Sequence, residues 1–329
     1  MERTLISRII PGTEVKVQGF LERVRNTGAM AFLVLRDRTG KVQVTIEKAV
    51  HPELAEELNN LTPESIVTVE GTAAANPQVR LNGLEILPER LVIESLAAPL
   101  PLNKDAAVDT RMDYRWLELR GEKERLLFEV QTCLVSAMRQ FLTERDFLEI
   151  HTPKLIAAAS ESGADVFEVK YFDRKAYLAQ SPQFYKQMAM AAGFERIFET
   201  GPVFRAEKSF TNRHATEFSG FDLEFSYIES FEDVMRLEAE LLAYALEQVA
   251  RRYGEAIERQ YGVKVIVPEL PFPQISLKEL YAELERRYGY TVLESEKGDM
   301  TTEAEQLSYR FSKEVFGHEF LFITDFAAE

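Results

Sequence analysis

Cationic and aromatic side chains cluster in one short part of the sequence, around Arg205. Two strand-like runs, one ending next to Arg205 and one beginning at Phe218, are joined by a loop that carries Arg213 and His214. Arginine favours anions because its planar fork makes paired bonds to phosphate or carboxylate, and an aromatic ring beside it can stack a nucleobase. Facing one cleft, these residues would form an ATP site without a glycine-rich phosphate loop. Arg205 and Glu207 taken alone would also fit a structural ion pair.

The elements around this cluster predict an α+β domain. Helical periodicity marks residues 122–145, 184–192, 231–260 and 277–288, and strand-like runs occupy 167–171, 176–179, 197–204 and 218–227. Strands paired by hairpins and backed by helices indicate a mostly antiparallel sheet flanked by helices.

The first hundred residues have a different pattern. Five strand-like runs cover 15–21, 31–35, 41–46, 65–71 and 84–93, and a helix-like stretch follows the third run. This order is typical of a small Greek-key barrel of the OB type. The predicted organisation is an OB-type domain over 1–98, a linker over 99–121 and a second domain over 122–329.

Composition narrows the functional classes. The 329 residues carry a net charge of −15, which argues against a protein that coats nucleic acid indiscriminately. A single cysteine excludes an internal disulfide framework, and four scattered histidines offer no metal-ligand spacing. With no long apolar run and no signal-peptide pattern, we expect a soluble cytoplasmic protein without a membrane span.

A local reversal of charge stands out in the first domain. Between residues 23 and 41 the basic side chains are opposed by Asp37 alone; they are Arg23, Arg25, Arg36, Arg38 and Lys41. An acidic protein can bind RNA through such a patch. A solvated charged hairpin is the alternative.

Several segments, in order, resemble the class II aminoacyl-tRNA synthetases in their aspartyl form. They are Val24-Arg25-Asn26 with Phe32 to Asp37 and Val42-Gln43, then Phe147 to Pro153, Tyr177 to Gln187, and Phe204 to Phe218. They are similar to the family's anticodon-binding module, its motif 1, its amino-acid-binding segment and its motif 2. The likeness covers nearly the whole chain and is closest to the archaeal and eukaryotic type, because no bulky insertion follows motif 2. It implies an enzyme that uses ATP and Mg²⁺ to join L-aspartate to tRNA(Asp), and a homodimer formed through motif 1.

The resemblance assigns roles around ATP. Arg205 would be the catalytic residue that bridges the α-carboxylate of aspartate and the α-phosphate. Glu207 and Phe218 would hold the adenine, and Arg213 and His214 would contact the outer phosphates. No protein nucleophile is required, because catalysis consists of positioning and charge neutralisation.

The resemblance also assigns an aspartate site. Lys186 would pair with the side-chain carboxylate with support from Gln183, whereas Asp222 and Glu161 would hold the ammonium group, with Ser181 nearby. Asparagine would leave Lys186 without its counter-charge, at a cost of about 2–5 kcal/mol. The alternative for the Gln180 to Lys186 run is a helix cap followed by an exposed lysine.

In the barrel, the resemblance implies that Phe32 stacks an anticodon base and Gln43 reads a base edge, while Arg25 does either or holds phosphate. The alternative for Phe32 is a core aromatic residue. Whether tRNA(Asn) is also charged stays open, and Phe20 and the Ala75-Asn76-Pro77 turn are the residues to examine.

The family's third motif, with an arginine for ATP and acids for magnesium, has no counterpart before Glu329. The last ten residues form an apolar strand-like run that requires strand partners. We therefore expect roughly a quarter of a synthetase, with the Mg²⁺ ligands, to lie outside this sequence. One rival is an asparaginyl-tRNA synthetase, against which the cationic Lys186 argues. The other is a non-catalytic tRNA-binding relative, which the missing motif favours.

Overall fold

The computed structural model describes residues 1–58, 61–103, 105–160, 166–206, 215–293 and 298–326. The chain forms two compact units, Met1–Glu118 and Leu119–Glu329. In the described ranges, no helix is both long enough and apolar enough to cross a membrane.

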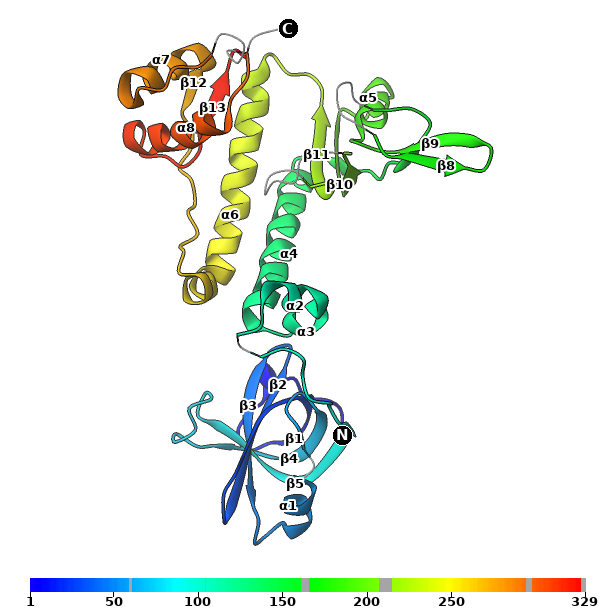
Figure 1. Cartoon of the computed structure of the whole chain (residues 1–329), viewed down its shortest axis with the longest axis vertical. Helices are drawn as coiled ribbons and strands as arrows, with labels where there is room; N and C mark the ends of the chain where they lie inside the picture. The colour runs from blue at the N-terminus through cyan, green and yellow to red at the C-terminus, as the bar shows by residue number, and fades with distance from the viewer. Residues whose placement is uncertain (59–60, 104, 161–165, 207–214, 294–297, 327–329) are drawn as a thin grey trace. The chain divides into compact units, whose positions relative to one another are not determined.

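A closed five-stranded barrel forms most of the first unit, as the sequence predicts (Figure 1). Its strands are β1 (Glu14–Asn26), β2 (Met30–Asp37), β3 (Gly40–Glu47), β4 (Ile66–Ala75) and β5 (Leu84–Ser95). They are hydrogen-bonded in the order β1-β2-β3-β5-β4. A 3₁₀ turn, η1 (Ile6–Arg8), precedes β1, and α1 (Pro52–Glu57) follows the third strand as predicted. The barrel and its inserted helix confirm the OB-type fold.

Alternation along the strands separates the inside of the barrel from the outside. In β2, Ala31, Leu33 and Leu35 are fully buried in the barrel core, whereas the residues between them are only half-buried. Period-two alternation puts successive side chains on opposite faces. A polar side chain on the outer surface can therefore be placed from the sequence once one core residue of its strand is known.

Two glycines allow the strands to close on one another. A Cβ at Gly19 would lie 2.4 Å from the Arg36 carbonyl oxygen, and one at Gly71 would lie 2.2 Å from the Leu87 carbonyl oxygen. The pairing of β4 with β5 shifts register next to Gly71. Glycine in a strand interior marks such close backbone approach and bending.

The segment 96–121 that follows the barrel contains two short helices, α2 (Val108–Asp113) and α3 (Arg115–Glu118). No side chain of either helix is buried. Their exposed side chains include three large apolar ones, Val108, Met112 and Trp116, although the stretch as a whole is polar.

The second unit is built around the hairpin of β10 (Arg196–Phe204) and β11 (Glu217–Phe225), with the short β6 (Leu148–Glu149) parallel to β10. One face of the hairpin packs on α4 (Glu122–Thr143) and α6 (Phe231–Tyr261). Phe198 and Phe221 stack there with ring centroids 5.7 Å apart. This apolar core fixes the position of both strands.

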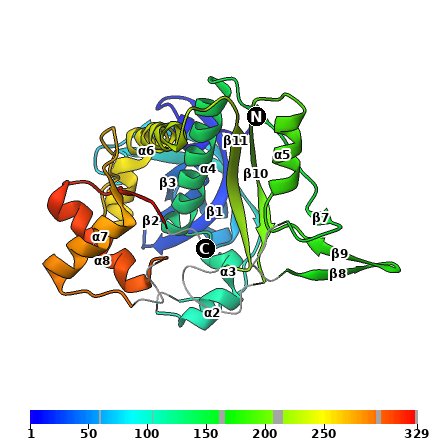
Figure 2. The ribbon, with the colours of Figure 1, turned by 90° about the horizontal axis from the view of Figure 1, so that it is seen from above.

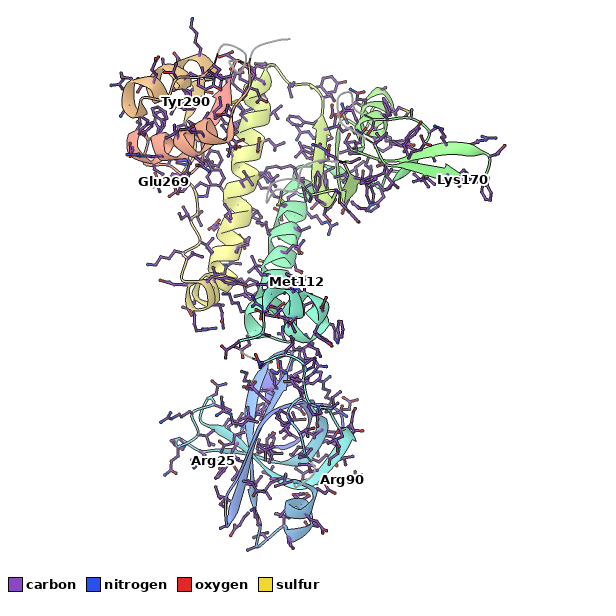
Figure 3. The ribbon with its side chains drawn as sticks, in the orientation of Figure 1. Arg25, Arg90, Met112, Lys170, Glu269 and Tyr290 are labelled. Atoms are coloured by element: carbon purple, nitrogen blue, oxygen red, sulfur yellow. The ribbon has the colours of Figure 1, made fainter. Side chains whose placement is uncertain are left out.

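The opposite face of the hairpin lies toward α5 (Gln183–Ala191), and Figure 2 shows α4 and α5 on opposite sides of β10 and β11. A second small sheet, in the order β7-β9-β8, leads into α5. Its strands are β7 (Leu155–Ile156), β8 (Glu168–Tyr171) and β9 (Arg174–Leu178). Lys170 marks the β8–β9 hairpin in Figure 3.

A last group of elements closes the described chain: β12 (Gln274–Ser276), α7 (Leu277–Tyr288), α8 (Thr302–Val315) and β13 (Phe322–Thr324). The predicted terminal strand-like run does pair, in parallel with β12. These elements share an apolar core that includes Tyr290, labelled in Figure 3. Helix α8 was not predicted from the sequence, although Thr301 caps it by accepting a hydrogen bond from the Ala304 amide.

Candidate active site

One face of the β10–β11 hairpin carries the polar residues that the sequence singled out. In the register, Glu199 lies opposite Asp222 and Val203 lies opposite Phe218. Residues two apart on a strand share a face. Phe218, Asp222 and Glu224 therefore line the face turned away from the apolar core, and this face is the candidate site.

Arg205 and Phe218 meet at one end of this face. The Arg205 amide donates a hydrogen bond to the Thr216 carbonyl oxygen (3.0 Å), which extends the hairpin pairing. The Arg205 guanidinium carbon lies 5.6 Å from the centre of the Phe218 ring. Phe218 is 39% exposed, so it retains surface for a further planar group. A cation beside an open aromatic face suits a nucleotide, as the sequence predicts.

Three further residues predicted for this end, Glu207, Arg213 and His214, lie outside the described residues. Their roles therefore stay predictions from the resemblance.

Lys186 lies at the other end of the face. Its ammonium group is 2.8 Å from Asp222 Oδ1 and 3.3 Å from Glu224 Oε2. The Lys186 side chain is only 14% exposed, so it is not the exposed lysine of the alternative interpretation. Burial acts to lower the pKa of Lys186, but the hydrogen bond and charge of Asp222, together with Glu224, raise it above its ordinary value. Lys186 is therefore held as a cation.

The start of α5 places Lys186. The Phe204 amide donates to the Ala179 carbonyl oxygen (2.9 Å), which joins the end of β10 to the segment that enters the helix. Ser181 is buried, and its hydroxyl accepts a hydrogen bond from the backbone amide of Gln183 (3.3 Å). The Gln183 side chain is half-buried. The predicted Glu161 lies outside the described residues.

Two glycines lie between the two ends. Gly201 of β10 and Gly220 of β11 are directly opposite each other, between the Val203–Phe218 pair and the Glu199–Asp222 pair. Phe218 and Asp222 are four residues apart, about 13 Å along a strand. Neither glycine projects a side chain between the two ends, and the ammonium end of Lys154 lies beside Gly201, 3.5 Å (Cε) and 3.7 Å (Nζ) from where a Cβ would be. A ligand that spans the face would therefore place a planar anionic part at Arg205 and a charged part at Lys186, and would pass Lys154 in between.

Two acidic residues of this face, Glu224 and Glu199, were not predicted from the sequence, and neither was Lys154, which pairs with Glu199. Glu224 lies two positions after Asp222 on the same strand, so period-two alternation could have identified it. Glu199 is 5% exposed and accepts hydrogen bonds from Lys154 Nζ (2.9 Å) and from the amide (2.9 Å) and hydroxyl (2.7 Å) of Thr152. Burial acts to raise the pKa of Glu199, but these hydrogen bonds outweigh it and hold the pKa below its usual value. A carboxylate inside an apolar strand was the available signal.

The barrel brings its predicted residues together on its outer surface. Arg25 pairs with Phe32 across β1 and β2, and Phe32 pairs with Thr45 across β2 and β3, so these side chains form one row (Arg25 is labelled in Figure 3). Phe32 is half-buried and lies outside the barrel core, so its interpretation as a core aromatic is wrong. Gln43 is two residues from Thr45 on the same face, and its amide donates to the Thr45 hydroxyl (3.0 Å).

A buried carboxylate supports this row. Glu85 accepts hydrogen bonds from Thr45 (2.5 Å) and from the side-chain amide of Asn76 (2.8 Å). It thereby ties the Asn76 turn to the strand that carries Gln43. Phe20, the other residue to examine, lies under the Arg36 guanidinium at 5.5 Å.

Comparison with known proteins decides the family. Residues 107–329 match the family described as tRNA synthetases class II (D, K and N), and residues 15–93 match the OB-fold nucleic acid binding domain. The chain belongs to the class II aminoacyl-tRNA synthetases. These enzymes are ligases, so the family assignment confirms the predicted enzyme class and fold.

Relatives of this synthetase span nearly the whole chain. It is 44% identical to the aspartate–tRNA(Asp/Asn) ligase of Methanopyrus kandleri over 97% of this chain and 73% of that one. It is 38% identical to the aspartate–tRNA(Asp) ligase of Pyrococcus abyssi over 98% of this chain and 74% of that one.

Solved structures of two specificities share the synthetase fold. Asparaginyl-tRNA synthetase from Pyrococcus horikoshii, complexed with asparaginyl-adenylate, has a TM-score of 0.85 at 30% identity and covers 94% of this chain and 72% of its own. A putative aspartyl-tRNA synthetase from Leishmania major Friedlin has a TM-score of 0.85 at 29% identity, covering 96% of this chain and 71% of its own. Backbone shape therefore does not separate the aspartyl from the asparaginyl enzyme, and side chains must.

Magnesium has no identified place on this synthetase face. Within the ranges that the structure describes, no group of three or more His, Cys, Asp or Glu side chains is arranged to hold a metal ion. Asp222 and Glu224 are both engaged by Lys186.

Proposed function

We propose that this chain is an aspartate–tRNA ligase, which activates L-aspartate with ATP and transfers it to tRNA(Asp). One observation carries the proposal: a largely buried lysine between two carboxylates shares a strand face with Arg205 and Phe218. That face matches an amino acid with a second carboxylate at one end and a nucleotide at the other. The names of the relatives support the same substrate.

In the first step, an α-carboxylate oxygen of aspartate attacks the α-phosphorus of ATP. The new P–O bond forms as the bond to the leaving pyrophosphate breaks, which yields aspartyl-adenylate. Arg205 supports this step because its fork can contact the carboxylate and the α-phosphate together. The ring of Phe218, stacked beside it, would hold the adenine, with Glu207. Arg213 and His214 would hold the outer phosphates.

Aspartate binding requires an exchange of partners around Lys186. The side-chain carboxylate of the substrate pairs with the ammonium group of Lys186, with support from Gln183. The substrate ammonium group pairs with Asp222 and Glu161, with Ser181 nearby. Asp222 and Glu224 are 28% and 31% exposed, so an incoming zwitterion can reach them. Asparagine offers Lys186 no negative charge, which costs about 2–5 kcal/mol in a desolvated site.

In the second step, a terminal ribose hydroxyl of the tRNA attacks the carbonyl carbon of the adenylate, and AMP leaves. The outer row of the barrel would select the tRNA: Phe32 stacks an anticodon base, Gln43 reads a base edge, and Arg25 contacts a base or phosphate. The Asp/Asn relatives make tRNA(Asn) a second candidate acceptor.

Several further properties belong to the same proposal. We expect a cytoplasmic homodimer, formed through residues 147–153, that uses Mg²⁺ with ATP. The domain boundaries that we propose are 1–98, 99–121 and 122–329.

Amino-acid-dependent exchange of pyrophosphate into ATP tests the proposal in the full-length protein. Aspartate should support exchange, whereas asparagine should be disfavoured by roughly 30-fold or more in kcat/KM. Preference for asparagine would establish the asparaginyl enzyme, which the structural likeness to the Pyrococcus horikoshii synthetase makes the second candidate. Absence of exchange with either amino acid would point to a non-catalytic relative.

A further inference from the structure

Two lysine–carboxylate pairs lie side by side on the candidate site. Glu199 of β10 is directly opposite Asp222 of β11, and side chains in such positions have Cβ atoms about 4.5–5.5 Å apart. Like charges placed directly opposite each other repel. Here each carboxylate has its own lysine, Lys154 at 2.9 Å from Glu199 and Lys186 at 2.8 Å from Asp222.

The two pairs differ in how firmly they are held. Glu199 is 5% exposed and also accepts both hydrogen bonds from Thr152, and Lys154 donates to the Thr152 hydroxyl as well (3.1 Å). The carboxylates that hold Lys186 are far more open to solvent. A ligand can therefore exchange partners with the Lys186 pair, whereas the Lys154 pair is a fixed part of the protein.

The position of Lys154 places its charge next to the middle of the strand face. A Cβ built on Gly201 would lie 3.5 Å from Lys154 Cε and 3.7 Å from its Nζ. Gly201 is on the bare stretch of backbone between Arg205 and the Glu199–Asp222 pair. The ammonium group thus lies over the middle of the site.

We propose that Lys154, paired with the buried Glu199, is a positioning residue that sets the charge of the amino-acid site. Lys186, Asp222 and Glu224 sum to −1, and the Lys154–Glu199 pair adds nothing to that sum. Without Lys154 the sum is −2. This excess negative charge repels a dicarboxylic amino acid, and it strengthens the attraction that holds Lys186 to the protein's own carboxylates. The inference rests on the proposed function, because it assumes that aspartate binds at Lys186.

Pyrophosphate exchange by charge-altered variants of the full-length protein tests this role. K154M should raise the KM for aspartate about ten-fold or more, with much smaller changes in kcat and in the KM for ATP. The neutral double variant K154M/E199Q should return the KM for aspartate to within about three-fold of wild type, since glutamine can keep both Thr152 contacts. E199Q alone should lower that KM, because it leaves an extra positive charge.

A matched control uses the surface pair of Lys175 and Glu168, which has the same 2.9 Å separation but side chains 70% and 50% exposed. K175M should leave all kinetic constants unchanged. Should K154M fail to fold, E199Q and K154M/E199Q still decide the matter. The inference predicts a lowered KM for aspartate in E199Q and a near-normal one in the double variant, whereas a purely structural role predicts a raised KM in both.

An unchanged KM for aspartate in K154M, or a raised one in E199Q, would overturn the inference. A loss of kcat in K154M that is restored neither in the double variant K154M/E199Q nor in K154R would also overturn it, because such a loss would indicate a structural role. If the wild-type protein exchanges pyrophosphate with aspartate and only the K154M effect is missing, the proposed function stands. If the wild-type protein shows no aspartate-dependent exchange, both proposals fail.

Discussion

Replacing Lys186 with methionine is the most informative perturbation of the proposed aspartate site. Methionine retains most of the length of the side chain but removes the charge that meets Asp222 at 2.8 Å and Glu224 at 3.3 Å. Both acids remain partly solvated, so the loss to folding should be about 1 kcal/mol or less. The variant should therefore be folded and should fail in one specific function.

The kinetic effect of this change is much larger than its effect on stability. The substrate carboxylate loses a charge-assisted partner at a site where the lysine is only 14% exposed, which corresponds to about 2–5 kcal/mol. At 1.36 kcal/mol per factor of ten, kcat/KM for aspartate should fall by roughly 30-fold to several thousand-fold. Asparagine lacks the carboxylate, so its kcat/KM should change far less.

The assay is pyrophosphate exchange with each amino acid, with K175M as the control that removes an exposed lysine from a similar pair. The ratio of the two kcat/KM values should collapse in K186M and stay constant in K175M. A folded K186M variant that retains its preference for aspartate would refute the reasoning, because the discriminating charge would then lie elsewhere.

Three other predictions concern separate parts of the molecule. F32A should reduce kcat/KM for tRNA charging by a factor that corresponds to about 1–3 kcal/mol, the usual cost of losing a base stack, and should leave pyrophosphate exchange unchanged. Equal damage to both steps would indicate misfolding instead. R205K should lower kcat for aspartate activation by about 100-fold, because lysine cannot make the paired contact, and a near-normal rate would contradict the bridging role. Because the pKa of Glu199 is lowered in the folded protein, its stabilising contribution is present above the unfolded pKa near 4.5 and is lost as the pH falls through the folded value. Acid unfolding followed by circular dichroism should therefore be less steep in E199Q, and identical profiles would show that Glu199 is not responsible.

The sequence was sufficient where a pattern is local. Alternation in the first hundred residues predicted the barrel strands, and the helical period predicted α7 with its exact limits. Phe32 and Gln43 fall on the outer surface because the residues beside them are buried. The missed helix α8 is as amphipathic as α7 and begins at a capping residue, Thr301, so both signals of a helix were present in the sequence and were not used.

The sequence was insufficient where function depends on pairing between distant segments. Lys154 and Glu199 are 45 positions apart, and only the pairing of the neighbouring strands brings them together. The antiparallel register that sets Glu199 opposite Asp222 is likewise a property of the folded hairpin. Glu224 was within reach of the sequence, because it follows Asp222 at strand spacing.

Equilibrium binding of a non-hydrolysable aspartyl-adenylate analogue, measured by calorimetry, tests most directly whether one strand face holds amino acid and nucleotide together. The wild-type protein should bind the aspartyl analogue much more tightly than the asparaginyl one. K186M and R205K, which alter opposite ends of the face, should each weaken binding of the aspartyl analogue. Equal affinity for both analogues, or binding that neither substitution changes, would contradict the account.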